Sequence, residues 1–278
     1  MNTDKRRKQE ELETRLAKEI AKNPDSGSFQ KAYDEFHRYI LENGVRDAPP
    51  EGCVYKKDLS LFDRICLGFI GEKKRVLDIG CGEGTLALAC ARRGNDVIGL
   101  DISTVLVQLA NSKKGSLPIE FEVGDARDLQ FPDQCFDVVI CKDVIEHLPE
   151  SSLDDHLREV GRVLRDGGVY MVYTPSRLLG DLSLGLHLKT YSIADLAPIL
   201  RENELTVEPI CHWLLLIGVR HRVSNRWLLS ALIHYEKLLD RIKVARLLSI
   251  FGDAAYAIVP MVWLCAVKSP GLRAKKLS

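Results

Sequence analysis

The chain of 278 residues carries 39 basic and 39 acidic side chains, so it has no formal net charge. Proteins that bind nucleic acid normally show a basic surplus, so no nucleic-acid partner is expected. The hydrophobic fraction of 46% is ordinary for a soluble globular protein. The length suits one well-filled domain with additions rather than two full domains.

The eight cysteines include no C-x-x-C pair. The sequence therefore lacks the cysteine spacing that is typical of a structural zinc site or a redox motif. The first twenty residues are charged and lack the apolar stretch of a signal peptide. The uncharged run over residues 254–267 is shorter than the ~20 residues that span a bilayer. These features favour a cytoplasmic location, with peripheral contact at the inner face of the membrane left open.

Three helices are predicted ahead of the first strand, over residues 4–22, 29–43 and 57–70. The first is charged with a thin apolar stripe, because Leu12, Leu16 and Ile20 recur at helical spacing. We divide the chain into an N-terminal helical extension, residues 1–54, and a main domain, residues 55–278.

From residue 75 onward, short β-branched runs alternate with helical patterns. Strands are predicted over residues 75–79, 96–100, 119–123, 136–142, 168–175 and 205–210. Helices are predicted over residues 85–93, 103–114, 151–165 and 190–203, with Ser103 as a helix N-cap. This alternation predicts a parallel sheet with helices on both faces. A last strand over residues 255–268 is expected as an antiparallel partner at the edge.

A glycine-rich turn follows the first of these strands, where residues 76–85 read VLDIGCGEGT. The chain has no G-x-x-x-x-G-K-S/T stretch, which excludes ATP or GTP bound in the P-loop manner. The dinucleotide fingerprint G-x-G-x-x-G also fails in detail, because Thr85 stands where the third glycine belongs. A nicotinamide oxidoreductase is therefore the weaker interpretation, although the strand–turn–helix arrangement remains.

Acidic residues near the turn indicate the charge of the ligand. Asp78 and Glu83 flank the glycines, and Asp101 ends the next apolar run, where a carboxylate accepts hydrogen bonds from a ribose diol. Negative charge here is unfavourable for a pyrophosphate and favourable for a cationic centre. A nucleoside with a positive centre fits the pattern better than a nucleotide.

These segments together resemble the class I S-adenosylmethionine-dependent methyltransferases over about residues 55–210 and the last strand. The matching stretches are VLDIGCGEG, the acid at Asp101, GDARDL (124–129), FDVVICKDVIEHLPE (136–150) and LREVGRVLRDGGVYMVYTP (157–175). Each is weak alone, but their order and distances make the resemblance specific. It implies an α/β fold with a Rossmann-like seven-stranded sheet, six strands parallel and one antiparallel, and helices on both faces.

The resemblance also implies where S-adenosyl-L-methionine binds. Asp101 would hold the ribose hydroxyls, Asp125 would meet the adenine amino group, and Ala126 would lie beside the ring. The full set of cofactor-binding residues that it implies is Asp78, Gly80, Cys81, Gly82, Asp101, Ile102, Asp125, Ala126 and Lys142.

The candidates for chemistry lie just after the fourth predicted strand. His147 is the candidate general base, and a structural histidine at the loop–helix junction is the alternative. The D-x-x-E-H stretch of Asp143, Glu146 and His147 is similar to the E-x-x-E-H stretch of the ubiquinone-pathway O-methyltransferases, whose acids and histidine bind a divalent cation. That resemblance implies a metal site here, with Mg²⁺ as the expected ion. The first acid is aspartate rather than glutamate, and I-E-H is also widespread in methyltransferases without metal.

The expected reaction is methyl transfer to a small-molecule or lipid-linked acceptor, most often at a hydroxyl oxygen, as in a quinone precursor or a polyprenyl-linked glycan. The N/D-P-P-Y-like tetrapeptide of enzymes that methylate amide or adenine nitrogens is replaced by CKDV. A methyltransferase acting on RNA or protein and a non-catalytic S-adenosylmethionine-binding protein remain alternatives. Tyr33, Tyr39 and Tyr55 are candidates for the acceptor pocket, because helices before the first strand often cover the cofactor mouth in this family.

An amphipathic helical insertion is predicted over residues 211–253, with seven basic and three acidic residues among large apolar ones. A basic amphipathic helix with tryptophans binds anionic membrane surfaces, so membrane-surface contact is one interpretation. A lid over an apolar substrate and packing on the sheet or on a second subunit are the others. The oligomeric state is left open.

Overall fold

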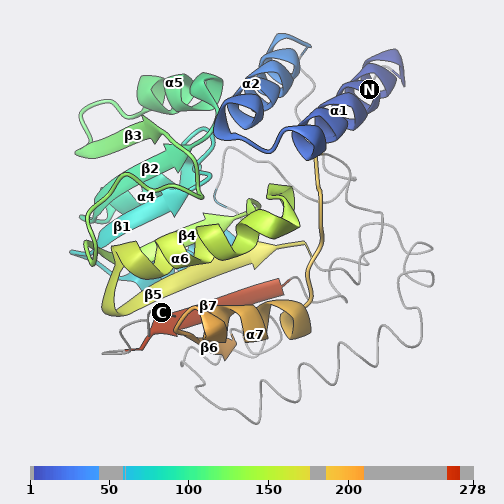
Figure 1. Cartoon of the computed structure of the whole chain (residues 1–278). Helices are drawn as coiled ribbons and strands as arrows, with labels where there is room; N and C mark the ends of the chain where they lie inside the picture. The colour runs from blue at the N-terminus through green and yellow to red at the C-terminus, as the bar shows by residue number, and fades with distance from the viewer. Residues whose placement is uncertain (1–2, 44–58, 60, 176–185, 210–261, 270–278) are drawn as a thin grey trace.

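The computed structural model describes residues 3–43, 59, 61–175, 186–209 and 262–269. The insertion predicted over residues 211–253 and Tyr55 lie outside these residues. The described strands form one seven-stranded sheet in the order β3-β2-β1-β4-β5-β7-β6 (Figure 1).

The strands are β1 (Arg75–Ile79), β2 (Asp96–Asp101), β3 (Ile119–Val123), β4 (Phe136–Lys142), β5 (Leu164–Thr174), β6 (Leu205–Pro209) and β7 (Val262–Lys268). The helices are α1 (Thr3–Lys22), α2 (Ser26–Asn43), α3 (Leu61–Ile70), α4 (Thr85–Arg92), α5 (Thr104–Lys113), α6 (Leu153–Val163) and α7 (Ile193–Glu202). Two short 3₁₀ turns, η1 (Ile145–His147) and η2 (Glu150–Ser152), connect β4 to α6.

The predicted sheet is confirmed in topology. Every pair from β3 through β2, β1 and β4 to β5 is parallel, and β7 runs antiparallel to both β5 and β6. Crossover connections by helices make this arrangement possible, because parallel neighbours need long connections. The carboxyl ends of the parallel strands therefore meet at one edge, where an α/β sheet binds its ligands.

Alternating side chains along the strands divide the core into two layers. In β4, Val138 packs with residues of α3, α4 and α5, whereas the next residue, Val139, packs with residues of α6 and α7. In β1, Val76 and Leu77 divide in the same way. Both faces of the sheet are buried, which explains why these strands are almost continuously apolar in sequence.

The structure moves some predicted boundaries. The helix expected over 151–165 ends at Val163, and β5 begins at Leu164, four residues before the predicted strand. Leu164 is fully buried and pairs with Phe136 across a register shift, so burial extends the strand through the two glycines that the sequence marks as a break. The second helix begins at Ser26, three residues early.

Asp25 provides the reason for that early start. Its carboxylate accepts hydrogen bonds from the Ser28 amide at 3.0 Å and from the Ser28 hydroxyl at 2.7 Å, as a helix cap does. The predicted cap at Ser103 is confirmed, since its hydroxyl accepts from the Leu106 amide at 3.4 Å.

Helices α1 and α2 lie side by side beyond the carboxyl ends of the parallel strands (Figure 1). Leu16 and Ile20 of α1 share a buried cluster with Phe29 and Tyr33 of α2, and Leu186, which lies between β5 and α7, joins it. The N-terminal helices thus cover the edge at which ligands bind in α/β sheets. None of the helices in the described part of the chain has the length and apolarity needed to cross a bilayer.

Candidate functional site

The glycine turn after β1 has a backbone that only glycine adopts readily. Gly80, Gly82 and Gly84 have φ angles of 70°, 55° and 84°. A Cβ on Gly80 would lie 2.2 Å from a methyl group of Val144, and one on Gly84 would lie 2.7 Å from the Phe121 ring. A Cβ on Gly82 would meet nothing within 4 Å, so the turn leaves open space above this residue. A ligand can approach the backbone there.

Asp101 fastens this turn to the start of α5. Its carboxylate accepts the Gly82 amide and the Ser103 amide, each at 2.8 Å, and the residue is only 7% exposed. Burial, aided by nearby Asp34, raises its pKa to about 6 against the effect of these two hydrogen bonds. A carboxylate has about four acceptor sites. Asp101 can therefore hold the turn and still accept from a ribose diol.

A second group of acids lies beneath the turn. Burial, followed by the nearby Asp63 carboxylate, raises the pKa of Asp78 to about 7. Asp63 of α3 forms an ion pair with Lys142 at 3.1 Å. The acids outnumber the one lysine, so this end of the site favours a cationic group. The sequence analysis missed Asp63, whose only signal was an acid inside the apolar stretch LFDRICLGFI.

Asp125 lies at the other end of the turn region and is already well bonded. Its carboxylate accepts from the Ser26 hydroxyl at 2.5 Å and from the Arg127 guanidinium at 2.6 Å. Burial raises its pKa, but Arg127 and Ser26 outweigh that effect and hold the pKa below its usual value. Arg127 also stacks on Phe29, 4.6 Å from the ring centroid, and donates to the Pro24 carbonyl. These partners, which the sequence analysis missed, join the start of α2 to the predicted adenine segment.

The remaining cofactor candidates have structural neighbours. Cys81 is buried beside Gly99 of β2, partly buried Ile102 packs against the cluster of α1 and α2, and the Ala126 carbonyl accepts from His156 Nδ1 at 2.8 Å. All of the predicted cofactor residues lie in or after β1, β2, β3 and β4, on the carboxyl-end side of the sheet.

His147 ends η1 and has a defined proton position. Its Nδ1 lies 3.1 Å from the Leu186 carbonyl oxygen, which can only accept, so Nδ1 carries the proton. Nε2 of a neutral imidazole then has a free lone pair. Burial, followed by the neighbouring His187, lowers the pKa of His147 to about 3. This histidine is therefore uncharged at neutral pH and keeps one nitrogen that can accept a proton.

Glu146, next to it, has an exposed fraction of 0% and uses only one of its carboxyl oxygens. Oε2 accepts from the Thr174 hydroxyl at 2.9 Å, whereas Oε1 has no hydrogen-bond partner among the described residues. Burial raises its pKa well above the usual value, and the adjacent Asp143 adds to the effect. Asp143 has a φ of 54°, and its own pKa is raised to about 6 by burial, with Lys142 opposing and Asp63 adding.

Three further rings gather around this pair. Tyr33 lies edge-on to His147 with the ring centroids 5.8 Å apart, His187 lies 4.8 Å from His147, and His37 lies 5.8 Å from Tyr33. We call Tyr33, His37, Glu146, His147 and His187 the His–Tyr cluster. Sequence analysis anticipated Tyr33 and missed His37 and His187. Tyr39 donates instead to the Lys5 carbonyl at 3.3 Å.

Burial lowers the pKa of His37 to about 4, against the effect of Asp34, and lowers that of His187. Burial, with Glu146 and Asp101 nearby, raises the pKa of Tyr33 well above its usual value. At neutral pH these rings are uncharged. Tyr33 lies close enough to both Glu146 and Asp101 for these acids to affect its pKa.

His156 of α6 provides a contrast. Its Nδ1 donates to the Ala126 carbonyl, and its Nε2 accepts from the Tyr170 hydroxyl at 3.0 Å. Both nitrogens are used inside the core, so this histidine is structural. His147 has the same kind of carbonyl partner at Nδ1, but no described residue occupies its Nε2.

Among the described residues, Glu146, His147 and His187 offer metal-ligand atoms within 4.8 Å of one another. Asp143, the first acid of the predicted D-x-x-E-H site, is not among them. One carboxylate and two imidazoles suit zinc or manganese better than Mg²⁺, which prefers an all-oxygen set. The gathered residues therefore do not fit the expected magnesium ion.

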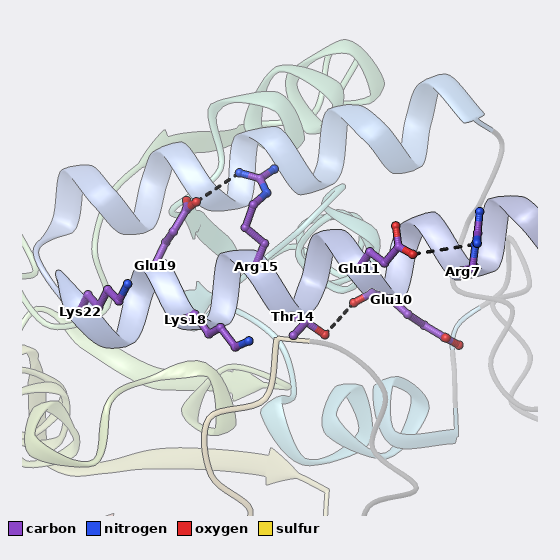
Figure 2. A pocket seen from close by; sticks show the side chains of 8 residues that line it. All are labelled: Arg7, Glu10, Glu11, Thr14, Arg15, Lys18, Glu19 and Lys22. Atoms are coloured by element: carbon purple, nitrogen blue, oxygen red, sulfur yellow. Dashed lines mark hydrogen bonds and ion pairs between the residues drawn. The ribbon is translucent and has the colours of Figure 1, made fainter.

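A hollow of about 570 Å³ lies elsewhere, along α1. Figure 2 shows its described lining, which comes entirely from this helix: Arg7, Glu10, Glu11, Thr14, Arg15, Lys18, Glu19 and Lys22. Arg7 pairs with Glu11 and Arg15 with Glu19. These exposed i,i+4 pairs are those of a solvated helix face and are worth little energy each.

Comparison with known proteins points to one family. The family described as "Methyltransferase domain" matches residues 76–168. A ubiquinone biosynthesis O-methyltransferase of Mesorhizobium japonicum is 33% identical over 117 residues, which are 41% of this chain and 46% of that protein. The fatty-acid O-methyltransferase of Mycolicibacterium smegmatis is 41% identical over 152 residues, which are 51% of this chain and 54% of that protein. The chain thus spans about half the length of these curated relatives.

Solved structures agree on the fold. The 4+2 cyclase SpnF has a TM-score of 0.56 at 22% identity, covering 89% of this chain and 98% of that one. The PH0226 protein of Pyrococcus horikoshii has a TM-score of 0.52 at 24% identity, covering 60% and 91%. At this identity the likeness concerns the fold alone. The sequence match, with the strand order and the glycine turn, identifies a class I S-adenosylmethionine-dependent methyltransferase domain in residues 76–168 of this chain.

Proposed function

We propose that the protein transfers a methyl group from S-adenosyl-L-methionine to a hydroxyl oxygen of a small, uncharged acceptor, with His147 as the general base. The observation that carries the proposal is the hydrogen bond from His147 Nδ1 to the Leu186 carbonyl. It leaves the Nε2 lone pair free to accept a proton.

The cofactor half supports a cationic nucleoside. Gly82 leaves room above the turn, Asp101 has acceptor capacity for a ribose, and the acids Asp63 and Asp78 outnumber Lys142 below. We assign the predicted cofactor residues to this half: Asp78, Gly80, Cys81, Gly82, Asp101, Ile102, Asp125, Ala126 and Lys142. For Asp125, an adenine amino group would share the carboxylate with Arg127 and Ser26.

The chemical step needs little beyond alignment and removal of one proton. The acceptor oxygen attacks the methyl carbon, the carbon–sulfur bond breaks, and its electron pair returns to sulfur to leave neutral S-adenosylhomocysteine. The hydroxyl proton moves to His147 Nε2 and later to solvent. Orientation alone contributes roughly 7–11 kcal/mol to such reactions, and a positioned base contributes about 10²–10⁴-fold.

A hydroxyl acceptor is preferred over a carboxylate for a reason within the site. A carboxylate needs no base, and it would place negative charge near Asp101 and Asp143. The relatives' names include both possibilities, a ubiquinone-pathway enzyme and a fatty-acid enzyme. The charges of this site favour the first kind of acceptor chemistry.

A metal-assisted reaction is the second candidate, favoured by the gathering of Glu146, His147 and His187. These three side chains would hold a zinc or manganese ion, and such an ion would polarise the acceptor hydroxyl as a Lewis acid. Elemental analysis of purified protein, with zinc and manganese titrations followed by calorimetry, distinguishes the two candidates. Stoichiometric metal lost in the His187→Ala variant would favour the metal, and no binding would favour the free base.

The test of the proposed function is an assay of S-adenosylhomocysteine release against a panel of acceptors. The panel contains simple phenols, a prenylated phenol, a fatty acid, a peptide mixture and transfer RNA. Turnover of a phenol, with the methyl group recovered on oxygen by mass spectrometry, is the expected result. Turnover confined to the fatty acid, the peptides or the RNA would refute the acceptor assignment, and failure to bind S-adenosylmethionine would refute the whole proposal.

A further inference from the structure

The buried polar atoms without partners gather in one place. Among the described residues there are five such atoms: Tyr33 Oη, His37 Nδ1, Glu146 Oε1, His187 Nδ1 and Tyr191 Oη. Four of them belong to the His–Tyr cluster, and the fifth, on Tyr191, lies close enough to Glu146 to be affected by its charge. A folded chain normally pairs such atoms or exposes them to water. Their concentration beside His147 indicates a polar ligand.

The unpaired atoms come from three separate segments. Tyr33 and His37 lie one turn apart on α2, and Glu146 lies in η1. His187 belongs to residues 186–192, the segment that leads into α7 (Figure 1) and whose first residue, Leu186, packs against α1. The amides of Leu188 and Lys189 donate to the Glu146 carbonyl at 2.8 and 3.1 Å. His187 is thereby fixed to the backbone of the catalytic turn.

Helix α2 is also held in place by hydrogen bonds. The Asp34 carboxylate accepts from the Ser103 hydroxyl at 2.9 Å and the Val105 amide at 3.2 Å, and Gln30 donates to the Thr104 hydroxyl at 3.0 Å. These contacts join α2 to the start of α5. They set Tyr33 and His37 in position beside His147.

We propose that Tyr33, His37 and His187 determine acceptor specificity by hydrogen bonding to a second, uncharged polar group that lies near the reacting hydroxyl of the acceptor. This inference rests on the proposed function in its metal-free form. Hydroxyl and imidazole groups both donate and accept, so they suit an alcohol or a carbonyl. The cluster contains no lysine or arginine to bind a carboxylate, and the nearby acids Asp101 and Asp143 disfavour a negatively charged group.

A set of matched phenols tests this proposal. The probes are ethylphenol, hydroxymethylphenol and hydroxybenzoate, each as its ortho, meta and para isomers, so that only the second group and its position change. Calorimetry measures their binding to the full chain saturated with S-adenosylhomocysteine, in the presence of EDTA. We expect at least one hydroxymethylphenol to bind at least tenfold more tightly than the matching ethylphenol and the matching hydroxybenzoate.

Two substitutions identify the residues responsible. Tyr33→Phe and His187→Ala should each reduce the preference for hydroxymethylphenol over ethylphenol at least fivefold, with the affinity for S-adenosylhomocysteine unchanged. Tyr39→Phe, on the same helix but bonded to the Lys5 carbonyl, is the matched control and should change neither value. A His187→Lys variant should move the preference toward hydroxybenzoate.

Other outcomes distinguish a failure of the specificity proposal from a failure of the proposed function. Tighter binding of hydroxybenzoate by the unaltered protein, an unchanged preference in both variants, or no phenol binding at all would overturn the specificity proposal. Each of these results leaves cofactor binding intact. A protein that fails to bind S-adenosylhomocysteine would instead overturn the proposed function beneath it.

Discussion

The two halves of the site differ in how their polar groups are satisfied. In the cofactor half, Asp101 holds two backbone amides, and Asp125 holds Arg127 and Ser26. In the His–Tyr cluster, four of the five residues keep a buried polar atom that has no partner in the part of the chain that the structure describes. The fold itself therefore satisfies the polar groups of the cofactor half, whereas our proposal leaves those of the acceptor half to be satisfied by the ligand.

This difference has an energetic meaning. An unsatisfied buried polar group costs about 1–3 kcal/mol, so several of them at one place lower the stability of the free protein. A ligand that supplies the missing hydrogen bonds recovers that free energy on binding. Strain of this kind is typical of functional sites, because stability there is secondary to recognition.

The sharpest test of the comparison is His147→Gln. Glutamine keeps a hydrogen-bond donor near the Leu186 carbonyl but has no basic lone pair, so kcat for a hydroxyl acceptor should fall about 10³-fold. The affinity for S-adenosylmethionine should stay within twofold, because the cofactor half does not use this residue. Steady-state kinetics with calorimetry measure both. A loss of cofactor affinity as large as the loss of kcat would mean that the two halves are not separate.

The next largest effect is expected at the other half. Asp101→Ala removes the acceptor of the Gly82 and Ser103 amides, and the affinity for S-adenosylmethionine should fall about 10²-fold, as expected for charged hydrogen bonds worth about 1.5–3 kcal/mol. Asp96→Ala is the control at the opposite end of the same strand, where the acid is exposed and pairs with Arg75. Equal affinities of the two variants would show that Asp101 does not contact the cofactor.

The strands and the glycine turn could be predicted because their signals are local. The bounds of β1, β3 and β4 agree with the predicted strands, since β-branched runs between turns are typical of buried strands. The glycines at 80, 82 and 84 predicted a turn after β1, and all three have positive φ. One contiguous motif carried this part of the prediction.

The acceptor half could not be predicted in the same way. His147 meets the Leu186 carbonyl across 39 positions of the chain. Some contacts of the cofactor half escaped prediction for the same reason: Lys142 meets Asp63 across 79 positions, and Ser26 meets Asp125 across 99. A single histidine such as His187 has no surrounding pattern, so only the packing of α2 and the segment before α7 shows its role. The predicted start of β5, at residue 168, was also wrong. The two glycines before it suggested a break in the chain, whereas the buried Leu164 already belongs to the strand.

The pH dependence of cofactor binding gives a smaller effect. The pKa of Asp78 is about 7, and its charged neighbours are Asp63, Lys142 and Asp101. The pKa of Asp101 is about 6, and its charged neighbour is Asp34. As the pH falls from 8 to 5.5, both acids take up protons and lose their attraction for the cationic cofactor. The affinity should drop about tenfold or more, because each protonated group weakens it by up to a factor of ten per pH unit. Calorimetry across this range measures it, with uncharged adenosine as the comparison ligand; a pH-independent affinity for S-adenosylmethionine would contradict the assignment.

The smallest effect concerns the helix that joins the two halves. Asp34→Ala removes the acceptor of the Ser103 hydroxyl and the Val105 amide, so unfolding should become easier by about 1 kcal/mol. KM for the acceptor should rise about threefold, because α2 carries Tyr33 and His37, while kcat stays nearly constant because His147 lies on η1. Glu35→Ala is the control, since this neighbouring acid forms an exposed ion pair with Arg15 and no other ion pair with a described residue. If Asp34→Ala lowered kcat instead and left KM unchanged, α2 would have to act on the chemical step, and the acceptor contacts assigned to Tyr33 and His37 would be wrong.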